Sequence, residues 1–279
     1  MNNLNITESF VARKASYNRF AKIQHEIVTC SDDKIILNID IQNRFGYTFL
    51  FLFCTLPYLS EKYNKKIEIY CNEKTYKLLV KLNYLKRNIE FSSTLNICPL
   101  LQENIMLIKK KEDIFNLVTE ITYEAPVAMS EQLSSIFISM AGEMYNNASE
   151  HSGGDVLGAK YFKNQKNAYC FTCYDTGIGI PYKVLNSVHE IHTQLEAFAW
   201  AMICGNSTVN SNIPRGVGLS LLQSFAKANE GTIRICSNKI LYVYNKRNGI
   251  KYYELDSEFY GTLFEMDIIA DNNKEYIIR

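Results

Sequence analysis

The sequence has almost no net charge, because 30 basic and 29 acidic side chains leave +1 at neutral pH. Proteins that hold nucleic acid or an anionic membrane by electrostatics show a clear basic excess. A long apolar run is also missing, since the longest, Phe49 to Leu56, is far too short to span a bilayer. Residues 1–10 are polar and contain no apolar signal-peptide core. We therefore expect a cytoplasmic protein that binds neither nucleic acid nor membrane.

Paired cysteine motifs are scarce. Of eight cysteines, only Cys170 and Cys173 stand in a C-x-x-C spacing, and no second pair or suitably spaced histidines accompany them. A structural zinc site needs such a second set of ligands. Both cysteines fall in an apolar run that predicts a strand, where residues three apart point to opposite faces. We expect buried, reduced thiols at these positions, and surface positions for His189 and His192.

Glycine is nearly absent from the first part of the chain. Gly46 is the only glycine before Gly142, and the other twelve follow. The length suits two domains of ordinary size. This shift in composition predicts a boundary near residue 125, with one α/β domain over residues 1–125 and a second over residues 126–279.

Strand and helix patterns alternate in the first domain. Strand–helix–strand order at these lengths predicts a parallel α/β unit. The expected elements are a helix around Glu8 to Ile27, a strand from Lys34 to Asp40, a helix from Tyr47 to Tyr63 that is kinked or restarted at Pro57, a strand from Lys66 to Tyr70, a helix from Glu73 to Leu85 and a strand from Asn88 to Phe91. Ile105 to Ile108 and Ile114 to Ile121 form the join or an edge strand.

The second domain is expected to place helices on one face of a sheet. Asn248-Gly249 is a strong hairpin turn signal between two of its strands. The expected elements are a helix from Ser130 to Glu150, strands from Leu157 to Phe162 and Ala168 to Tyr174, a helix ending near Ala228, and strands at Thr232 to Cys236, Ile240 to Tyr244, Lys251 to Leu255 and Thr262 to Ile268.

A glycine-rich turn follows the apolar run that ends at Tyr174. It reads Asp175-Thr176-Gly177-Ile178-Gly179-Ile180-Pro181. Glycines let the backbone take positive φ and let a flat ligand approach without a Cβ in the way. The carboxylate of Asp175 only accepts hydrogen bonds, which suits an exocyclic amine. The turn is a candidate ligand site, although an ordinary turn could have the same residues.

A polar row follows one line of the helix predicted from Ser130. Glu143, Asn147 and His151 are four residues apart, so they stack beside the apolar stripe of that helix. Such a row lines a pocket wall or forms the edge of a solvated face.

A second glycine-rich stretch opens the helix that ends near Ala228. Glycines at a helix N-terminus expose backbone N–H groups and the positive end of the helix dipole, which suits phosphate. It is not a dinucleotide fingerprint, because the third glycine and the preceding strand are missing. The residues are Arg215, Gly216, Val217, Gly218 and Leu219.

In this order, E-x-x-x-N-A-x-x-H, D-x-G-x-G-I-P and G-x-G-L-x-L-L resemble the N, G1 and G2 boxes of the GHKL ATPase superfamily. That superfamily includes DNA gyrase, heat-shock chaperone, histidine kinase and mismatch-repair ATPases. The resemblance covers Ser130 to Ile268. Gly205 to Thr208 and the late Gly261-Thr262 are similar to the branch of anti-sigma-factor serine kinases. The resemblance to this superfamily implies a Bergerat α/β sandwich with a mixed sheet over residues 126–279.

The resemblance implies a nucleotide site. Asp175 would accept the N6 amine of adenine, Gly177 and Gly179 would let the ring approach, and Thr262 would sit nearby through water. The segment from Pro181 to Pro214 would be the ATP lid. Arg215, Gly216, Val217, Gly218 and Leu219 would hold the phosphates.

The N box carries the implied catalytic roles. Asn147 would bind Mg²⁺, a hard cation that takes few protein ligands besides phosphate oxygens and water. Glu143 would orient or deprotonate a nucleophile near the γ-phosphate. His151 would have a supporting role in ATP binding. The implied cofactors are therefore ATP and Mg²⁺.

The order and sizes of elements in residues 1–125 are similar to STAS-like domains of the anti-anti-sigma type, which occur beside ATPases of this branch. Those domains often carry a phosphorylated serine near the start of the first helix. Here that region, Arg44 to Thr48, contains no serine. The resemblance thus favours docking of a protein partner or a homodimer contact over phosphorylation at this place.

Three functions are compatible with these residues. The first is a slow Mg²⁺-dependent ATPase that acts as a regulatory switch, with the N-terminal domain passing the nucleotide state to a partner. The second is a protein serine/threonine kinase of anti-sigma-factor type, with Glu143 as base. The third is a non-catalytic nucleotide sensor, against which an intact Glu143 argues. The sequence does not separate the first two.

Overall fold

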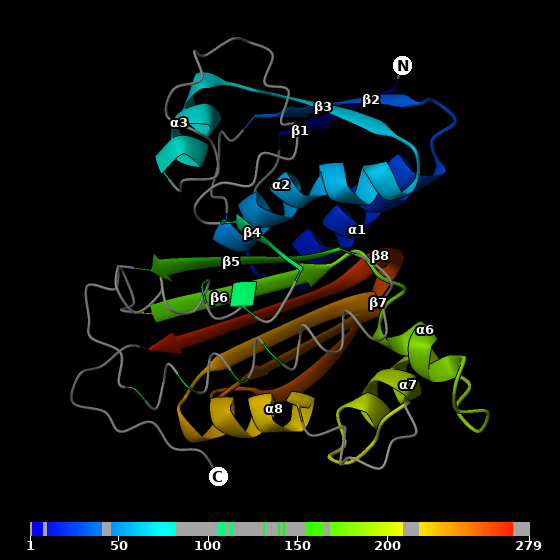
Figure 1. Ribbon diagram of the computed structural model, residues 1–279, viewed down its shortest axis with the longest axis vertical. Coiled ribbons are helices and arrows are strands. Elements are labelled where there is room, and N and C mark those ends of the chain that lie inside the picture. Colours follow the sequence, from blue (N-terminus) through cyan, green and yellow to red (C-terminus); the bar gives the residue numbers. More distant parts are fainter. Residues whose placement is uncertain are drawn as a thin grey trace.

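A layer of two helices lies between two β-sheets in the computed structural model (Figure 1). The structure describes residues 2–7, 10–40, 46–81, 105–109, 155–163, 168–208 and 218–269, with single positions at 112, 113, 116, 131, 135, 139 and 142. Its elements are β1 (Asn2–Ile6), α1 (Lys14–Thr29), β2 (Lys34–Ile39), α2 (Tyr47–Lys62), β3 (Lys66–Cys71), α3 (Glu73–Lys81), β4 (Ile105–Ile108), β5 (Val156–Lys163), β6 (Ala168–Asp175), α6 (Ile180–Leu185), α7 (Gln194–Ala201), α8 (Gly218–Ala228), β7 (Thr232–Asn245) and β8 (Gly249–Ile269).

The first sheet is parallel and has the order β1-β2-β3. Alternate residues of β2 are buried toward the helix layer, which is the period-two pattern of a half-buried strand. The predicted parallel α/β unit is confirmed. Strand β1 was not predicted, because it reads Asn-Asn-Leu-Asn-Ile and asparagine is depleted in strands.

The second sheet has five strands in the order β4-β5-β6-β8-β7. Each pairing among these described strands is antiparallel, so the mixed sheet expected here is not found in this part of the chain. Strand β4 forms one edge, as the apolar stretch from Ile105 to Ile108 suggested. Two long strands, β7 and β8, replace the four short ones predicted, and the hairpin turn at Asn248-Gly249 is confirmed.

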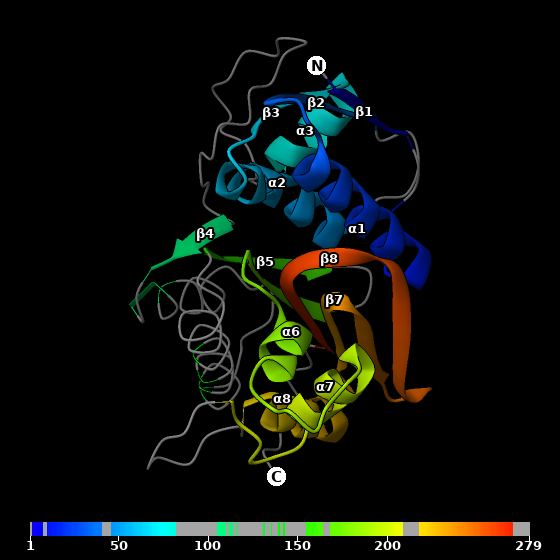
Figure 2. The same ribbon diagram turned by 90° about the vertical axis from the view of Figure 1, so that its right-hand side faces the viewer.

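Helix α2 explains why the helices are enclosed by sheets on both sides (Figure 2). An amphipathic helix buries one stripe, whereas a helix that is apolar all round needs cover on every side. Residues 51–60 of α2 are all buried. The helix also continues through Pro57 as one element, without the predicted restart.

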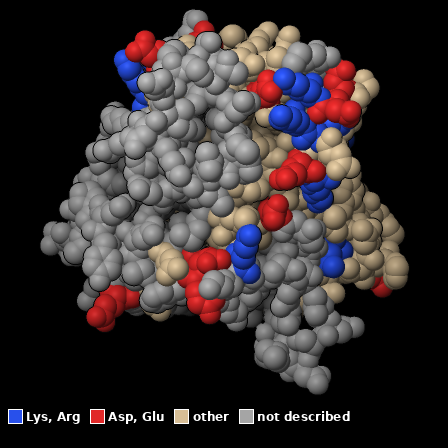
Figure 3. Space-filling view, turned by 45° about the horizontal axis from the view of Figure 1, so that its top comes forward, with Lys and Arg blue, Asp and Glu red and all other residues tan. Residues whose placement is uncertain are grey.

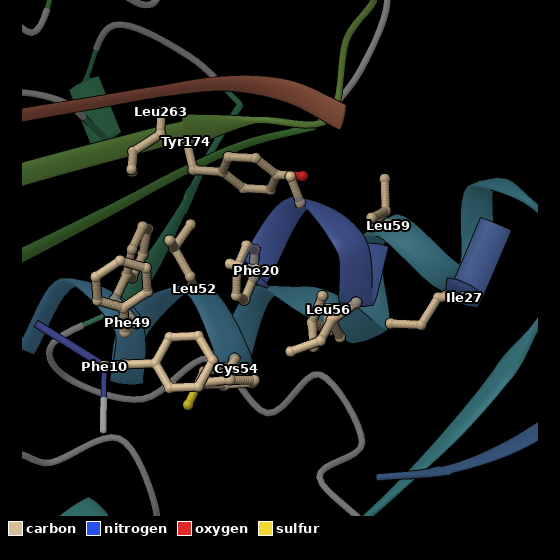
Figure 4. Packing of buried hydrophobic residues seen from close by; sticks show 14 of the residues in the cluster. Phe10, Phe20, Ile27, Phe49, Leu52, Cys54, Leu56, Leu59, Tyr174 and Leu263 are labelled. Atoms are coloured by element: carbon tan, nitrogen blue, oxygen red, sulfur yellow. The ribbon is translucent and has the colours of Figure 1, made fainter. Parts of the chain in front are cut away.

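One cluster of buried residues joins the helix layer to both sheets. Phe10, Phe20 and Phe49 pack together in it, and Tyr174 and Leu263 reach it from β6 and β8 (Figure 4). The core around α1 and α2 therefore draws on residues from both sides of the predicted boundary near residue 125. The division into two domains stays a prediction.

The opposite face of the five-stranded sheet carries α6, α7 and α8 (Figure 1). Described helices thus cover both faces of this sheet, whereas the sequence suggested helices on one face only. The difference arises because α1 and α2 of the N-terminal part also pack against β8 and β5.

Several predicted elements fall outside the described residues, among them the strand from Asn88 to Phe91 and most of the helix from Ser130 to Glu150. Positions 131, 135, 139 and 142 of that helix are helical. Helix α1 begins at Lys14, six residues later than its predicted start at Glu8.

Basic and acidic side chains lie next to one another on the described part of the face shown in Figure 3. This mixture agrees with the net charge of +1. Within the described part of the chain, no helix combines the length and the apolar character needed to cross a membrane.

Candidate functional site

Asp175 stands at the carboxyl end of β6, opposite Thr262 of β8. Its Oδ1 accepts a hydrogen bond of 2.8 Å from the backbone N–H of Gly177. Burial raises the pKa of Asp175 to about 6, while hydrogen bonds from Gly177 and Thr262 and the charge of Lys62 act in the opposite direction. The carboxylate is therefore fixed in orientation and mostly ionised at neutral pH, which makes it a strong acceptor for an amine.

The register of the strands places the side chains of Asp175, Thr262 and Ser237 on one face of the sheet. Asp175 pairs with Thr262, and Thr262 pairs with Ser237. Cross-strand partners share a face, so all three lie opposite the face that carries Tyr174 and its helix contacts. The hydroxyl groups of Ser237 and Thr262 are 3.0 Å apart. This is the face on which α6, α7 and α8 lie.

The turn after Asp175 is tied to β7 at the place where the pairing of β7 with β8 is irregular. The N–H of Ile180 donates to Ser237 Oγ at 2.9 Å, and Asn238 Nδ2 donates to the carbonyl of Ile178 at 3.0 Å. Register shifts flank Asn238, whose φ is +49°. This irregular pairing turns the Asn238 side chain toward the turn, and its hydrogen bonds fix the path of the turn.

Gly179 is required by this contact. Its φ is +88°, and a Cβ at this position would lie well under 3.0 Å from Asn238 Oδ1. The side chain of Asn238 thus takes the space that the missing Cβ leaves. The role expected for Gly179, room for an adenine ring, stays a prediction, and the structure supplies a second reason for the glycine.

The described part of the segment that the resemblance assigns to an ATP lid contains the helices α6 and α7. Thr193 caps α7 with a capping box, in which its hydroxyl accepts from the N–H of Glu196 and the Glu196 carboxylate accepts from the N–H of Thr193. Glu258 of β8 accepts from the Tyr182 hydroxyl at 2.8 Å and from Gln194 Nε2 at 3.0 Å. Both α6 and α7 are therefore anchored to the sheet.

Helix α8 begins at Gly218, within the glycine-rich stretch, and ends at Ala228 as predicted. Leu222 and Phe225 are buried, and Gln223 Nε2 donates to the Tyr242 hydroxyl of β7 at 2.6 Å. These contacts direct the start of α8, with Gly218 and Leu219, along the face of the sheet that carries Asp175.

The remaining predicted site residues lie outside the described residues. They are Glu143, Asn147 and His151 of the N box and Arg215, Gly216 and Val217 of the G2 box. The magnesium ligand, the catalytic base and most of the phosphate contacts therefore stay predictions.

A second group of ionisable side chains lies on the face of the five-stranded sheet that packs against α1 and α2. Arg234 Nη1 is 2.8 Å from Glu265 Oε1 and 3.2 Å from Asp267 Oδ2. Burial alone would lower the pKa of Arg234, but these two carboxylates raise it. Cys170, Glu265 and Asp267 have the spacing of metal ligands, but the guanidinium already supplies the positive charge between the carboxylates.

The predicted burial of Cys170 and Cys173 is confirmed. Cys170 and Cys173 are free thiols with 2% and 3% exposure. Cys170 lies near Glu265, on the face that packs against α1 and α2. Burial raises the pKa of Cys173. His189 and His192 are exposed, as expected.

Sequence reasoning missed Ser237, Asn238 and Gln24. A signal existed for the first two, because the predicted strands stop at Cys236 and resume at Ile240, and the irregular pairing with β8 falls in this gap. No local pattern marked Gln24, whose partners lie 150 and 236 residues away.

No protein-family model matches the chain. No curated protein matches it in sequence either.

Proposed function

We propose that the protein binds Mg²⁺–ATP in the manner of the GHKL ATPases and acts as a slow, nucleotide-dependent regulatory switch. The observation that supports this best is the environment of Asp175. A carboxylate at a strand end, fixed by Gly177 and Thr262 and ionised at neutral pH, suits the exocyclic amine of adenine. The three sequence motifs supply the rest of the proposal.

Each part of the nucleotide has a proposed partner in this chain. Asp175 would accept from the adenine N6 amine, and hydrogen bonds to charged groups contribute about 1.5–3 kcal/mol. The start of α8, with Gly218 and Leu219, would face the phosphates with its backbone N–H groups. Mg²⁺ would supply charge neutralisation at the phosphates, and its assignment to Asn147 rests on the resemblance alone.

Turnover would depend on Glu143, again by resemblance. As general base it would orient or deprotonate the nucleophile that attacks the γ-phosphate. A water nucleophile gives an ATPase, and a hydroxyl of a partner protein gives a kinase. The role of residues 1–125 in passing the nucleotide state to a partner is part of the same proposal.

The experiment that tests this function follows γ-labelled ATP with Mg²⁺ and measures free phosphate and protein-bound label together. We expect slow release of free phosphate from the wild type and none from Glu143→Ala, which should still bind ATP. Label on the chain or on an added partner would instead support the kinase. Normal turnover by Glu143→Ala would contradict the base assignment.

A further inference from the structure

Strand β8 contains residues that have no pairing partner on the neighbouring strand β7. Ser237 pairs with Thr262, but the next residue, Asn238, pairs with Phe259. Tyr260 and Gly261 are therefore extra residues in a bulge. A bulge removes backbone groups from the ladder, and buried groups of this kind need other partners.

Helix α1 supplies those partners through one side chain. Gln24 is fully buried, and its Oε1 accepts a hydrogen bond of 3.0 Å from the N–H of Tyr260. Its Nε2 donates to the carbonyl of Tyr260 at 3.2 Å and to the Tyr174 hydroxyl at 3.1 Å. The Tyr174 hydroxyl in turn donates to the same carbonyl at 2.8 Å. Both backbone groups of Tyr260 are thereby satisfied.

The bulge lies next to the candidate adenine site on both strands. Tyr174 directly precedes Asp175 on β6, and Tyr260 stands two residues before Thr262 on β8. Thr262 in turn hydrogen-bonds the Asp175 carboxylate. Apolar contacts keep α1 in place here, because the rings of Phe20 and Phe259 are 5.9 Å apart.

We propose that Gln24 is a positioning residue of the nucleotide site, which holds the β8 bulge so that Thr262 and Asp175 keep their geometry toward adenine. The N-terminal part of the chain thus completes the base-recognition side of the site. This inference rests on the proposed function and names a regulatory connection for it. Anything that shifts α1 would change adenine recognition through Gln24.

A second contact from the helix layer points to the same turn. Lys62, at the end of α2, donates from Nζ to the carbonyl of Thr176, the residue after Asp175. The charge of Lys62 also favours the ionised form of Asp175. Both helices between the sheets therefore contact the segment that carries the candidate site.

The test compares three ligands, which are ATP, GTP and inorganic tripolyphosphate, by titration calorimetry. Gln24→Leu keeps the volume of the side chain and removes its hydrogen bonds. We expect its affinity for ATP to fall about tenfold. Affinity for tripolyphosphate should stay within about twofold, because the proposed phosphate contacts, at and before the start of α8, do not include the β8 bulge. The ratio of ATP to GTP affinity should fall as well.

Asn18→Ala is the matched control on the same helix. Asn18 also clamps a residue of β8, accepting from the N–H of Asp256 at 3.0 Å and donating to its carboxylate at 2.8 Å, but away from the bulge. Its ATP to GTP ratio should equal that of the wild type. Tyr174→Phe removes two hydrogen bonds, one to the Tyr260 carbonyl and one from Gln24, and leaves the ring in place. We expect a loss in ATP affinity of about threefold.

The results distinguish this inference from the proposed function. If the wild type binds ATP but Gln24→Leu and Tyr174→Phe bind it equally well, the positioning role is wrong and the proposed function stands. Equal losses for ATP and tripolyphosphate would also overturn it, since they would reflect general destabilisation. A wild type that binds neither ATP nor GTP would overturn both.

Discussion

The backbone carbonyl of Asp175 lies directly beside Gly261, where β8 passes the end of β6. A Cβ built on Gly261 would fall well under 3.0 Å from that oxygen, and φ of Gly261 is +88°. Two strands that carry the candidate site therefore approach more closely than any residue with a side chain allows.

Gly261→Ala should destabilise the protein for two reasons, backbone strain at positive φ and a clash with Asp175. Gly205→Ala is its matched control, because φ of Gly205 is +89° and nothing lies within 4 Å of its Cβ position. The strain costs about 1–3 kcal/mol in each variant. The clash should add about 1–3 kcal/mol in Gly261→Ala only. Urea unfolding measures both, and equal free energies of unfolding would contradict the close approach.

Asp175→Asn should change how stability depends on pH. The pKa of Asp175 is raised from 3.8 to about 6 in the folded protein, so between these values the folded state binds more protons than the unfolded state. Ionisation of Asp175 therefore lowers the stability of the wild type as pH rises from about 4 to about 6. The variant lacks this loss and should gain about 1–3 kcal/mol relative to the wild type between pH 4.5 and pH 7.5. Parallel pH profiles for the two proteins would show that Asp175 has an ordinary pKa.

Thr262→Val should weaken ATP binding, because it removes the hydroxyl that orients the Asp175 carboxylate and bonds Ser237. We expect a loss of about threefold to tenfold, measured by titration calorimetry. Thr172→Val is the control, since Thr172 is a buried threonine of β6 on the opposite face. The same loss in both variants would mean that the hydroxyl of Thr262 has no special part in binding.

Arg234→Met should cost about 3–5 kcal/mol of stability, because it removes the guanidinium that lies 2.8 Å from the buried carboxylate of Glu265. Glu265 is 1% exposed, and the Tyr17 hydroxyl donates a hydrogen bond of 3.2 Å to its carboxylate. Adding Glu265→Gln to the variant should restore part of the loss. Lys246→Met is the comparison at an exposed ion pair, where about 0–1 kcal/mol is expected. A loss below that of Lys246→Met would argue against a buried charge network.

Much of the fold could be predicted because the apolar pattern of each element is local. The parallel unit around β2 and β3 and the hairpin at Asn248-Gly249 followed from periodicity and turn residues. The breaks expected in β7 and β8 correspond to bulges, since a bulge and a loop both interrupt the alternation of side chains. The apolar sequence of α2 implied that this helix is buried on all sides, but it did not indicate which sheets cover it.

The candidate site could be predicted only in part for the same physical reason. Asp175, Gly177 and Gly179 form a local motif, so spacing alone marked them. The contacts that hold them come from Asn238, and from Gln24 by way of Tyr260, which are distant in sequence. Hydrogen bonds between a helix near one end of the chain and a strand near the other leave no periodic trace in the sequence.

The central claim is that Asp175 recognises the adenine of ATP, and one measurement tests it most directly. ATP with Mg²⁺ is titrated into the wild type, Asp175→Ala and the surface control Asp256→Ala in a calorimeter at neutral pH. We predict that Asp175→Ala weakens binding roughly tenfold to a hundredfold while Asp256→Ala binds as the wild type does. Equal affinity of all three proteins for ATP, or no binding by the wild type, would contradict the account.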